Sequence, residues 1–257
     1  MNEFDVWFSR VEISNKQKLE LLSYYEPEQI WNMNRKKLNY IGLDDITISK
    51  ILDRQYRDNV DDYFKYLKNH RIHLVTMKDY YYPQKLMDIP DFPAYLFIKG
   101  DKKILEEDSV AIIGSRYCTS QGKELAYKTA KELGDKNINV VSGLANGIDT
   151  FAHLGSLESS FGKTIAVLAN GLASSDLYPP TNLKLAKEIV KRGGALVSEY
   201  IVGTKARKEY FPIRNRIVSG LANKILVVEA GEKSGTLITV RSWIRPRKRD
   251  ICSTSED

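Results

Sequence analysis

VAIIGSR, residues 110–116, opens the part of the chain that decides its fold. Three further glycine-rich turns follow it, VVSGLANGID (140–149), AVLANGL (166–172) and GGALVSEY (193–200), and then an arginine cluster, FPIRNR (211–216). Each turn follows or joins an apolar run, so each marks the end of a short buried strand. Strands that end in glycines with polar residues behind them often carry a phosphate-bearing ligand at their carboxyl ends.

Short apolar strands alternate with helical patterns from residue 110 onward. We expect strands at 110–113, 139–142, 164–168, 195–198 and 225–229, and helices at 119–136, 148–159, 182–192 and 215–221. Strands without alternation, separated by helices, indicate a parallel sheet that is covered on both faces. The sequence therefore predicts an α/β fold with an extended Rossmann-like, mostly parallel, doubly wound sheet.

The first 75 residues or so have a different pattern. Apolar residues recur there at helical spacing, and a short strand is expected at 73–76. We therefore predict a small helical domain at 1–78, a Rossmann-like domain at 79–241 and a separate basic tail at 242–257.

Composition excludes several classes of protein. The chain has 257 residues, two cysteines and three histidines in no ligand-like spacing, so we expect neither a metal site nor a disulfide framework. It has no apolar run of about 18 residues, and its acidic, aromatic start is unlike a signal peptide. We expect a cytoplasmic protein with no membrane contact.

The net charge of +6 is concentrated near the C-terminus. Residues 1–200 hold 27 basic and 27 acidic side chains, whereas residues 201–257 hold 12 basic and 6 acidic ones. A localised basic surface can bind nucleic acid or another polyanion. A solvated basic face with no partner is the alternative that charge alone leaves open.

The glycine turns do not match the known nucleotide-binding motifs. Neither VAIIGSR nor SGLANGID has the G-x-G-x-x-G spacing, and the phosphate loop of nucleotide hydrolases is also absent. We therefore expect no nucleotide cofactor.

Polar groups nevertheless converge at the predicted strand ends. Backbone N–H groups of Gly114 and Ser115, near a helix start, can hold a phosphate with Arg116. The second turn contributes Ser142, Gly143 and Asn146. Asp149 and His153 lie four residues apart on one helical face, which favours a structural hydrogen-bonded pair over a catalytic one.

The FPIRNR segment is the motif that indicates function most specifically. Arg214 and Arg216 can bind phosphates, Phe211 can stack on a base, and Asn215 fits a turn that leads into a helix. The alternative places Phe211 in the core and one of the arginines in an internal salt bridge.

The whole stretch from residue 82 to 240 resembles the DNA-processing protein family called DprA or Smf. The matching pieces include YPQKL, FPAYLFIKGD, VAIIGSR, VVSGLANGIDTFAH, YPPTN, FPIRNRIVSGLA and SGTLIT, in the family's order and spacing. The helical N-terminus is similar to the family's sterile-alpha-motif or helix–hairpin–helix-like domain.

This resemblance implies a non-catalytic protein that binds single-stranded DNA. Such proteins protect incoming strands in natural transformation, help to load the recombinase RecA, and act as homodimers. The DNA-binding residues that the resemblance implies are Gly114, Ser115, Arg116, Phe211, Arg214 and Arg216, with Lys163 and Lys184 as further candidates.

The C-terminus departs from the family's pattern. After SGTLITV the chain reads RSWIRPRKRDICSTSED, where the family continues with a helix and a final strand. Codons for residues 248–255, read in a shifted frame, can spell the family-like Ile-Phe-Ala-Val-Pro. We therefore hypothesise a frameshift near Ser242, which would remove an edge strand and much of the family's dimer and RecA contacts.

A nucleotide-binding enzyme or sensor of the lysine-decarboxylase-like Rossmann superfamily is the main alternative function. The SGTLIT segment is faintly similar to the glycine–threonine turn of those enzymes, but their Pro-Gly-Gly-x-Gly-Thr-x-x-Glu motif is absent. A scaffold with an inert basic face is a third possibility.

Overall fold

A computed structural model describes residues 1–229 and 251–253 of the chain. Its backbone divides into two compact units. The first holds residues 1–82 and 93–96, and the second holds residues 83–92 and 97 onward. The predicted tail at 242–257 lies outside the described residues, except for residues 251–253.

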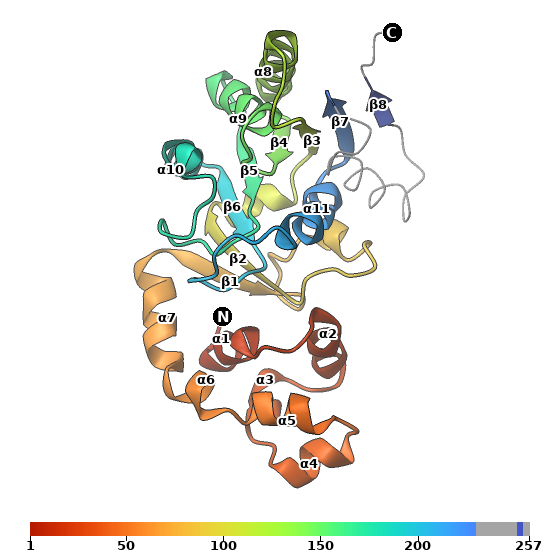
Figure 1. The fold of residues 1–257 in the computed structure, drawn as a ribbon, viewed down its shortest axis with the longest axis vertical. Coiled ribbons are helices and arrows are strands. Elements are labelled where there is room, and N and C mark those ends of the chain that lie inside the picture. Colours follow the sequence, from red (N-terminus) through yellow and green to blue (C-terminus); the bar gives the residue numbers. More distant parts are fainter. Residues whose placement is uncertain (230–250, 254–257) are drawn as a thin grey trace. The chain divides into compact units, whose positions relative to one another are not determined.

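The first unit is helical (Figure 1). Its elements are α1 (Glu3–Arg10), α2 (Asn15–Tyr24), α3 (Pro27–Trp31), α4 (Arg35–Tyr40), α5 (Asp45–Ile51), α6 (Arg54–Asp58), α7 (Val60–Asn69) and β1 (Ile72–Thr76). The helices are short, and side-chain caps such as Asn2, Ser14 and Asp44 satisfy backbone N–H groups at their starts. The buried ring of Trp7 packs edge-on against Trp31 at 5.0 Å between centroids, which anchors α1 on α3.

The second unit is the α/β domain. Its elements are η1 (Gln84–Leu86), β2 (Tyr95–Gly100), η2 (Lys102–Leu105), β3 (Ser109–Gly114), α8 (Ser120–Asp135), β4 (Asn139–Ser142), α9 (Ile148–Glu158), β5 (Thr164–Val167), η3 (Pro180–Asn182), α10 (Leu183–Lys191), β6 (Ala195–Ser198), α11 (Tyr210–Leu221), β7 (Lys224–Val228) and β8 (Ile251–Ser253). The first two residues of β2 belong to the helical unit.

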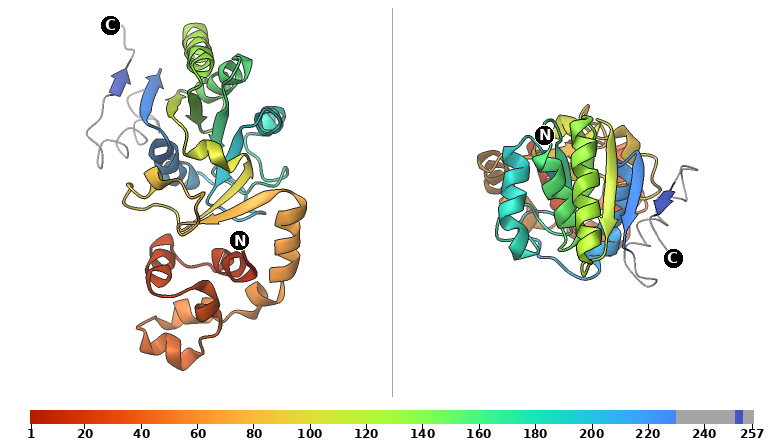
Figure 2. Two further views of the ribbon diagram at one scale, coloured as in Figure 1. Left: turned by 180° about the vertical axis from the view of Figure 1, so that it is seen from behind. Right: turned by 90° about the horizontal axis from the view of Figure 1, so that it is seen from above.

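The sheet of this unit has the strand order β2-β6-β5-β4-β3-β7-β8. Strands β3 to β8 pair in parallel, and β2 pairs antiparallel with β6. From β3 to β6, each successive strand is added next to the previous one in the same direction across the sheet. Right-handed crossovers between these strands therefore place α8, α9 and α10 on one face (Figure 2). The return from β6 to β7 places α11 on the other face. The expected mostly parallel, Rossmann-like α/β fold is therefore confirmed.

Small residues allow α8 and α9 to pack closely on the sheet. Ala126 and Ala130 from α8 and Ala152 from α9 are fully buried against Ile112 of β3, in a cluster that includes Val228 of β7. The other face of the sheet contacts α11 at β3, β4 and β5, and Ile217 and Val218 of this helix are buried. Because the sheet is covered on both faces, its carboxyl edge is where the strand ends meet polar loops.

Two sequence expectations need correction. Helix α11 begins at Tyr210 rather than Asn215, because Pro212 falls in the first helical turn, where a missing N–H costs nothing. The edge of β7 was expected to be left unpaired after a frameshift, but β8 pairs with it in parallel from Ile225↔Ile251 to Val227↔Ser253. Residues 251–253 thus satisfy backbone groups of β7 that would otherwise lack partners.

Candidate functional site

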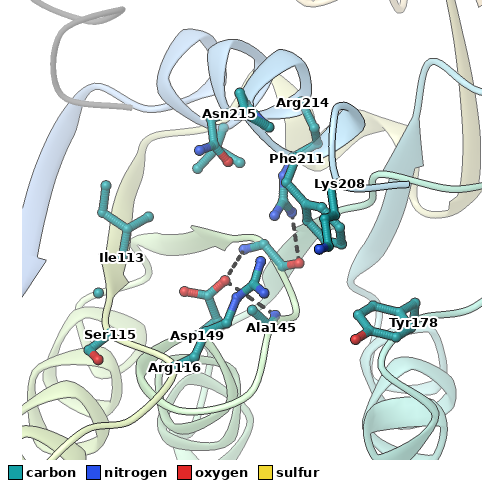
Figure 3. Close-up of a pocket in the computed structure, with 14 residues that line it drawn as sticks. Ile113, Ser115, Arg116, Ala145, Asp149, Tyr178, Lys208, Phe211, Arg214 and Asn215 are labelled. Carbon is teal, nitrogen blue, oxygen red and sulfur yellow. Dashed lines mark hydrogen bonds between the residues drawn. The ribbon is translucent and has the colours of Figure 1, made fainter. Parts of the chain in front are cut away.

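A cavity of about 530 Å³ lies at the carboxyl ends of β3 and β4, on the side of the sheet that α11 covers (Figure 3). The β3 end, the β4–α9 turn and α11 contribute most of its lining. The residues that line it are Ile113, Gly114, Ser115, Arg116, Gly143, Ala145, Asp149, Tyr178, Lys208, Phe211, Pro212, Arg214, Asn215 and Val218. The two glycine turns and the FPIRNR segment, distant in sequence, therefore meet here.

The end of β3 turns sharply into the cavity. A side chain at Gly114 would collide with the carbonyl oxygen of Val228, so the strand can end here only as glycine. Ser115 fixes the turn, since its hydroxyl donates to Tyr117 O at 2.8 Å and accepts from Tyr117 N at 3.1 Å. Arg116 is exposed, and its guanidinium lies 4.9 Å from the centre of the Phe211 ring.

The start of α8 does not offer its first turn to a phosphate. Thr119 caps the helix, and the carboxylate of Glu229 accepts hydrogen bonds from Thr119 N, at 2.8 Å, and from Thr119 Oγ1. Gly122 makes room for this carboxylate, because a Cβ there would collide with it. Glu229 thus places an internal anion at the positive end of the α8 dipole, and the expected phosphate contact at Gly114 and Ser115 stays a prediction.

The side chain of Asp149 stabilises the β4–α9 turn by hydrogen bonds to the turn's backbone. This carboxylate is 7% exposed and accepts from the N–H groups of Gly143, at 3.1 Å, and Ala145, at 3.2 Å. Burial raises its pKa, and the nearby Arg214 acts against that rise. Ser142 was expected among the ligand-binding residues, but it is fully buried and donates to Ile112 O at 2.7 Å.

His153 does not pair with Asp149, contrary to the expectation from their spacing. Its Nδ1 lies 2.7 Å from Thr164 Oγ1, and that hydroxyl donates its proton to Val140 O at 2.8 Å. Nδ1 must therefore carry the proton, which assigns the neutral tautomer. Burial, and then the charge of Arg214, lower the pKa of His153 to about 3. The spacing of four residues indicated only that the two side chains share a helical face, whereas Asp149 bonds to the β4–α9 turn and His153 to β5.

Arg214 is a buried part of the cavity's structure. It is 4% exposed, and its Nη1 donates to the carbonyl oxygens of Gly143, at 2.7 Å, and Val167. These carbonyls follow β4 and end β5, so one guanidinium ties two strand ends together. A side chain at Gly143 would displace it. Burial lowers the pKa of Arg214 to about 10, and Asp149 acts in the opposite direction. We refer to Gly143, Asp149 and Arg214 as the floor.

Arg216 points away from the cavity. Its Nη2 bonds to Glu199 Oε2 at 2.6 Å and its Nε to Asp91 Oδ2 at 3.2 Å, and 12% of its side chain is exposed. Residues two apart on a helix point about 200° apart, so Arg214 and Arg216 lie on opposite sides of α11. The internal salt bridge that was the alternative for one of the arginines is confirmed for Arg216, and its binding of the ligand stays a prediction.

Four groups, of which three are exposed and Phe211 is half-buried, form the entrance of the cavity, which we call the rim. They are Arg116, Tyr178, Lys208 and Phe211. Sequence reasoning missed Tyr178 and Lys208, although YPPTN was recognised as a family motif and Lys208 lies in the basic run from 205 to 208. Asn215 also lines the cavity, and Asn146 lines a smaller one beside it, of about 170 Å³.

The two candidate lysines line neither of these cavities. Lys163 precedes β5 at the amino ends of the strands, where its carbonyl accepts from Val140 N, so it lies at the opposite edge of the sheet. Lys184 is exposed in the first turn of α10. Within residues 1–229, no group of three histidine, cysteine, aspartate or glutamate side chains is arranged to hold a metal ion. None of the described helices is long and apolar enough to cross a membrane.

Comparison with known proteins gives one consistent family. A family model described as DNA recombination-mediator protein A matches residues 73–255. Protein Smf of Escherichia coli is 36% identical over 185 residues, which cover 72% of this chain and 49% of that protein. DNA processing protein DprA of Bacillus subtilis is 41% identical over 169 residues, covering 65% and 56%. The chain thus spans about half the length of these curated relatives.

Solved structures agree with the sequence relatives. The X-ray structure of DNA processing protein A from Streptococcus pneumoniae matches with a TM-score of 0.80 at 30% identity, over 98% of this chain and 86% of that one. A structure of DNA processing protein A from Helicobacter pylori, described as showing a single-stranded DNA binding mode, matches with a TM-score of 0.59 at 31% identity, over 66% and 75%. The family match through residue 255 includes the segment for which we hypothesised a frameshift.

Proposed function

We propose that this chain, which belongs to the DNA recombination-mediator protein A family, binds single-stranded DNA across the rim of its cavity. The observation that carries the proposal is that exposed cationic side chains and aromatic rings lie together at the carboxyl edge of the sheet. Arg116 and Lys208 are exposed, and the rings of Tyr178 and Phe211 lie 6.0 Å apart beside them.

The chemistry of the rim suits an unpaired strand. Arginine and lysine attract phosphates, and aromatic rings stack on bases without sequence preference. In a duplex the bases are stacked on one another, so rings in a recess cannot reach their faces. The rim therefore favours single strands over double strands.

We propose that the chain acts without catalysis. Asp149 and His153, the two residues weighed as a catalytic pair, are buried, and they hydrogen-bond to backbone N–H groups and to Thr164 respectively. The raised pKa of Asp149 and the lowered pKa of His153 both follow from burial first, and each group serves the fold of the β4–α9 turn or the sheet.

The family and the named relatives support a wider proposal. We propose that the chain protects incoming single strands, helps to load RecA on them in natural transformation and recombination, and works as a homodimer in the cytoplasm. The description of the family as a recombination mediator and the naming of its relatives as DNA processing proteins are the support for this part.

A titration of fluorescein-labelled oligo-dT tests the binding proposal. Fluorescence polarisation is measured at two salt concentrations and then in competition with nucleoside monophosphates. We expect affinity that falls steeply with salt, because phosphate contacts release counterions, and no displacement by equimolar monophosphates. Displacement by monophosphates would favour the nucleotide-binding alternative. The absence of binding at low salt would contradict the proposal and favour an inert scaffold.

A further inference from the structure

We infer that the smaller cavity beside the rim is a slot for a single nucleobase of the bound strand. This inference rests on the proposed function. The slot has a volume of about 170 Å³ and is lined by Arg116, Asn146, Tyr178, Pro179 and Phe211, among others. Arg116, Tyr178 and Phe211 also line the larger cavity, so the slot opens where we propose that the DNA backbone lies.

The size of the slot limits its occupant. Sites for drug-sized ligands usually enclose about 300–1,000 Å³, and the slot is smaller than this range. It is therefore matched to one planar ring system and not to a dinucleotide. The larger cavity remains for the sugar and phosphates that accompany the base.

Tyr178 offers the slot a flat apolar surface. Its ring meets Phe211 at 64°, so the two rings are not stacked on each other, and 47% of Tyr178 is exposed. Phe211 is partly covered by the guanidinium of Arg116, which lies 4.9 Å from its centre. Phe211 therefore supports the wall, whereas Tyr178 and the guanidinium plane are the surfaces on which a base can stack.

Asn146 gives the slot a directional hydrogen bond. Its amide oxygen accepts from Thr181 Oγ1 at 3.0 Å, which orients the amide so that Nδ2 is the group presented to a ligand. Nδ2 can only donate, so it selects an acceptor on the base edge, such as a carbonyl oxygen of thymine. Asn146 is exposed and can reach a ligand without rearrangement of the fold.

Three nine-nucleotide strands test the slot. One is oligo-dT, one is entirely abasic, and one is abasic except for a single central thymine. All three carry the same phosphates, so they differ only in bases. If one slot supplies the base contact, a single thymine should bind roughly five- to a hundredfold more tightly than the abasic strand, the range expected for stacking one base. The single-thymine strand should then already show most of the gain in affinity that oligo-dT shows over the abasic strand.

Variants of the slot give the matched comparison. Tyr178→Ala should remove most of the gain, measured as the ratio of the affinity for the single-thymine strand to that for the abasic strand. Asn146→Ala should reduce the gain by a smaller factor. Tyr80→Ala is the control, because Tyr80 is 90% exposed and belongs to the helical unit. Circular dichroism verifies that each variant is folded.

The outcomes separate the slot from the proposed function. If no strand binds at low salt, the proposed function fails, and the slot fails with it. If all three strands bind equally to the wild-type chain, single-stranded DNA binding stands and the slot is contradicted. If affinity instead rises evenly with the number of thymines, the bases contact an extended surface, and a single slot is likewise contradicted.

Discussion

The rim and the floor of the cavity use the same type of residue in opposite ways. Arg116 on the rim is exposed and lies over an aromatic ring, whereas Arg214 on the floor is 4% exposed and bonded to two backbone carbonyls. The side chains of the rim are open to solvent and can bind a ligand, whereas the polar groups of the floor are already hydrogen-bonded within the protein. An arginine within a motif that predicts binding can therefore have a purely structural role.

This comparison assigns separate tasks to the two regions. The floor sets the conformation of the β4–α9 turn, because Arg214 holds the carbonyl of Gly143 while Asp149 holds its N–H. The rim depends on that turn, since Gly143 and Ala145 line both cavities. Changes in the floor should therefore act mainly on stability, and changes in the rim mainly on binding.

The largest effect is expected for Arg214→Met. The substitution removes the donor to Gly143 and Val167 and leaves the buried carboxylate of Asp149 without its neighbouring cation. Leaving a buried group without its charged hydrogen-bond partner costs about 1–3 kcal/mol, so the two carbonyls together predict a loss of about 2–6 kcal/mol of unfolding free energy. Urea unfolding monitored by circular dichroism measures the change. Arg116→Met is the matched control and should stay within about 0.5 kcal/mol, because Arg116 is exposed; an equal loss in both variants would contradict the comparison.

A somewhat smaller effect is expected from pH through His153. The pKa of this group is about 6.5 in the unfolded chain and about 3 in the folded one. Between these values the unfolded chain binds a proton that the folded chain does not, so stability falls as the pH falls. The loss attributable to His153 should be about 1.7 kcal/mol between pH 6.5 and pH 5.

His153→Asn isolates that contribution, because asparagine can still donate to Thr164 but does not titrate. The variant's unfolding free energy should be flatter over the same pH interval, as measured by urea unfolding at each pH. The raised pKa of Asp149 acts in the opposite sense, but it is present in both proteins and cancels in the difference. Parallel pH curves for the two proteins would show that His153 is not buried in its neutral form.

The smallest effect concerns Glu229 at the start of α8. Glu229→Ala removes an anion from the helix N-terminus and should cost about 1 kcal/mol of stability. Phosphate should then raise the melting temperature of the variant more than that of the wild-type chain, because the helix start becomes accessible. Glu132→Ala, at an exposed site farther along α8, is the control. An unchanged phosphate response would mean that Glu229 does not occupy an anion position.

The sequence predicted much of the fold because its strands are short, apolar and bounded by glycines. The helix expected at 119–136 is α8, which has Thr119 as its N-cap. The start of α11 was missed because Pro212, read as part of a turn, is tolerated in the first helical turn.

The candidate site was harder to predict, since the sequence does not tell which side of α11 is buried. Arg214 and Arg216 were therefore treated alike, although one ties strand ends together and the other bonds to Glu199. Ser142 was expected to bind the ligand and His153 to pair with Asp149, because their actual partners, Ile112 and Thr164, come from strands distant in sequence. Such pairings depend on strand order, which periodicity does not reveal.

The salt dependence of oligo-dT binding tests the separation of rim and floor most directly. The logarithm of the association constant is plotted against the logarithm of salt concentration for the wild-type chain, Arg116→Ala and Arg214→Met, under conditions where each is folded. Each lost phosphate contact should reduce the slope by about 0.7 for a single strand. We predict that reduction for Arg116→Ala, with binding weaker by about 1–3 kcal/mol, and an unchanged slope for Arg214→Met. A reduced slope for Arg214→Met with an unchanged slope for Arg116→Ala would contradict the account.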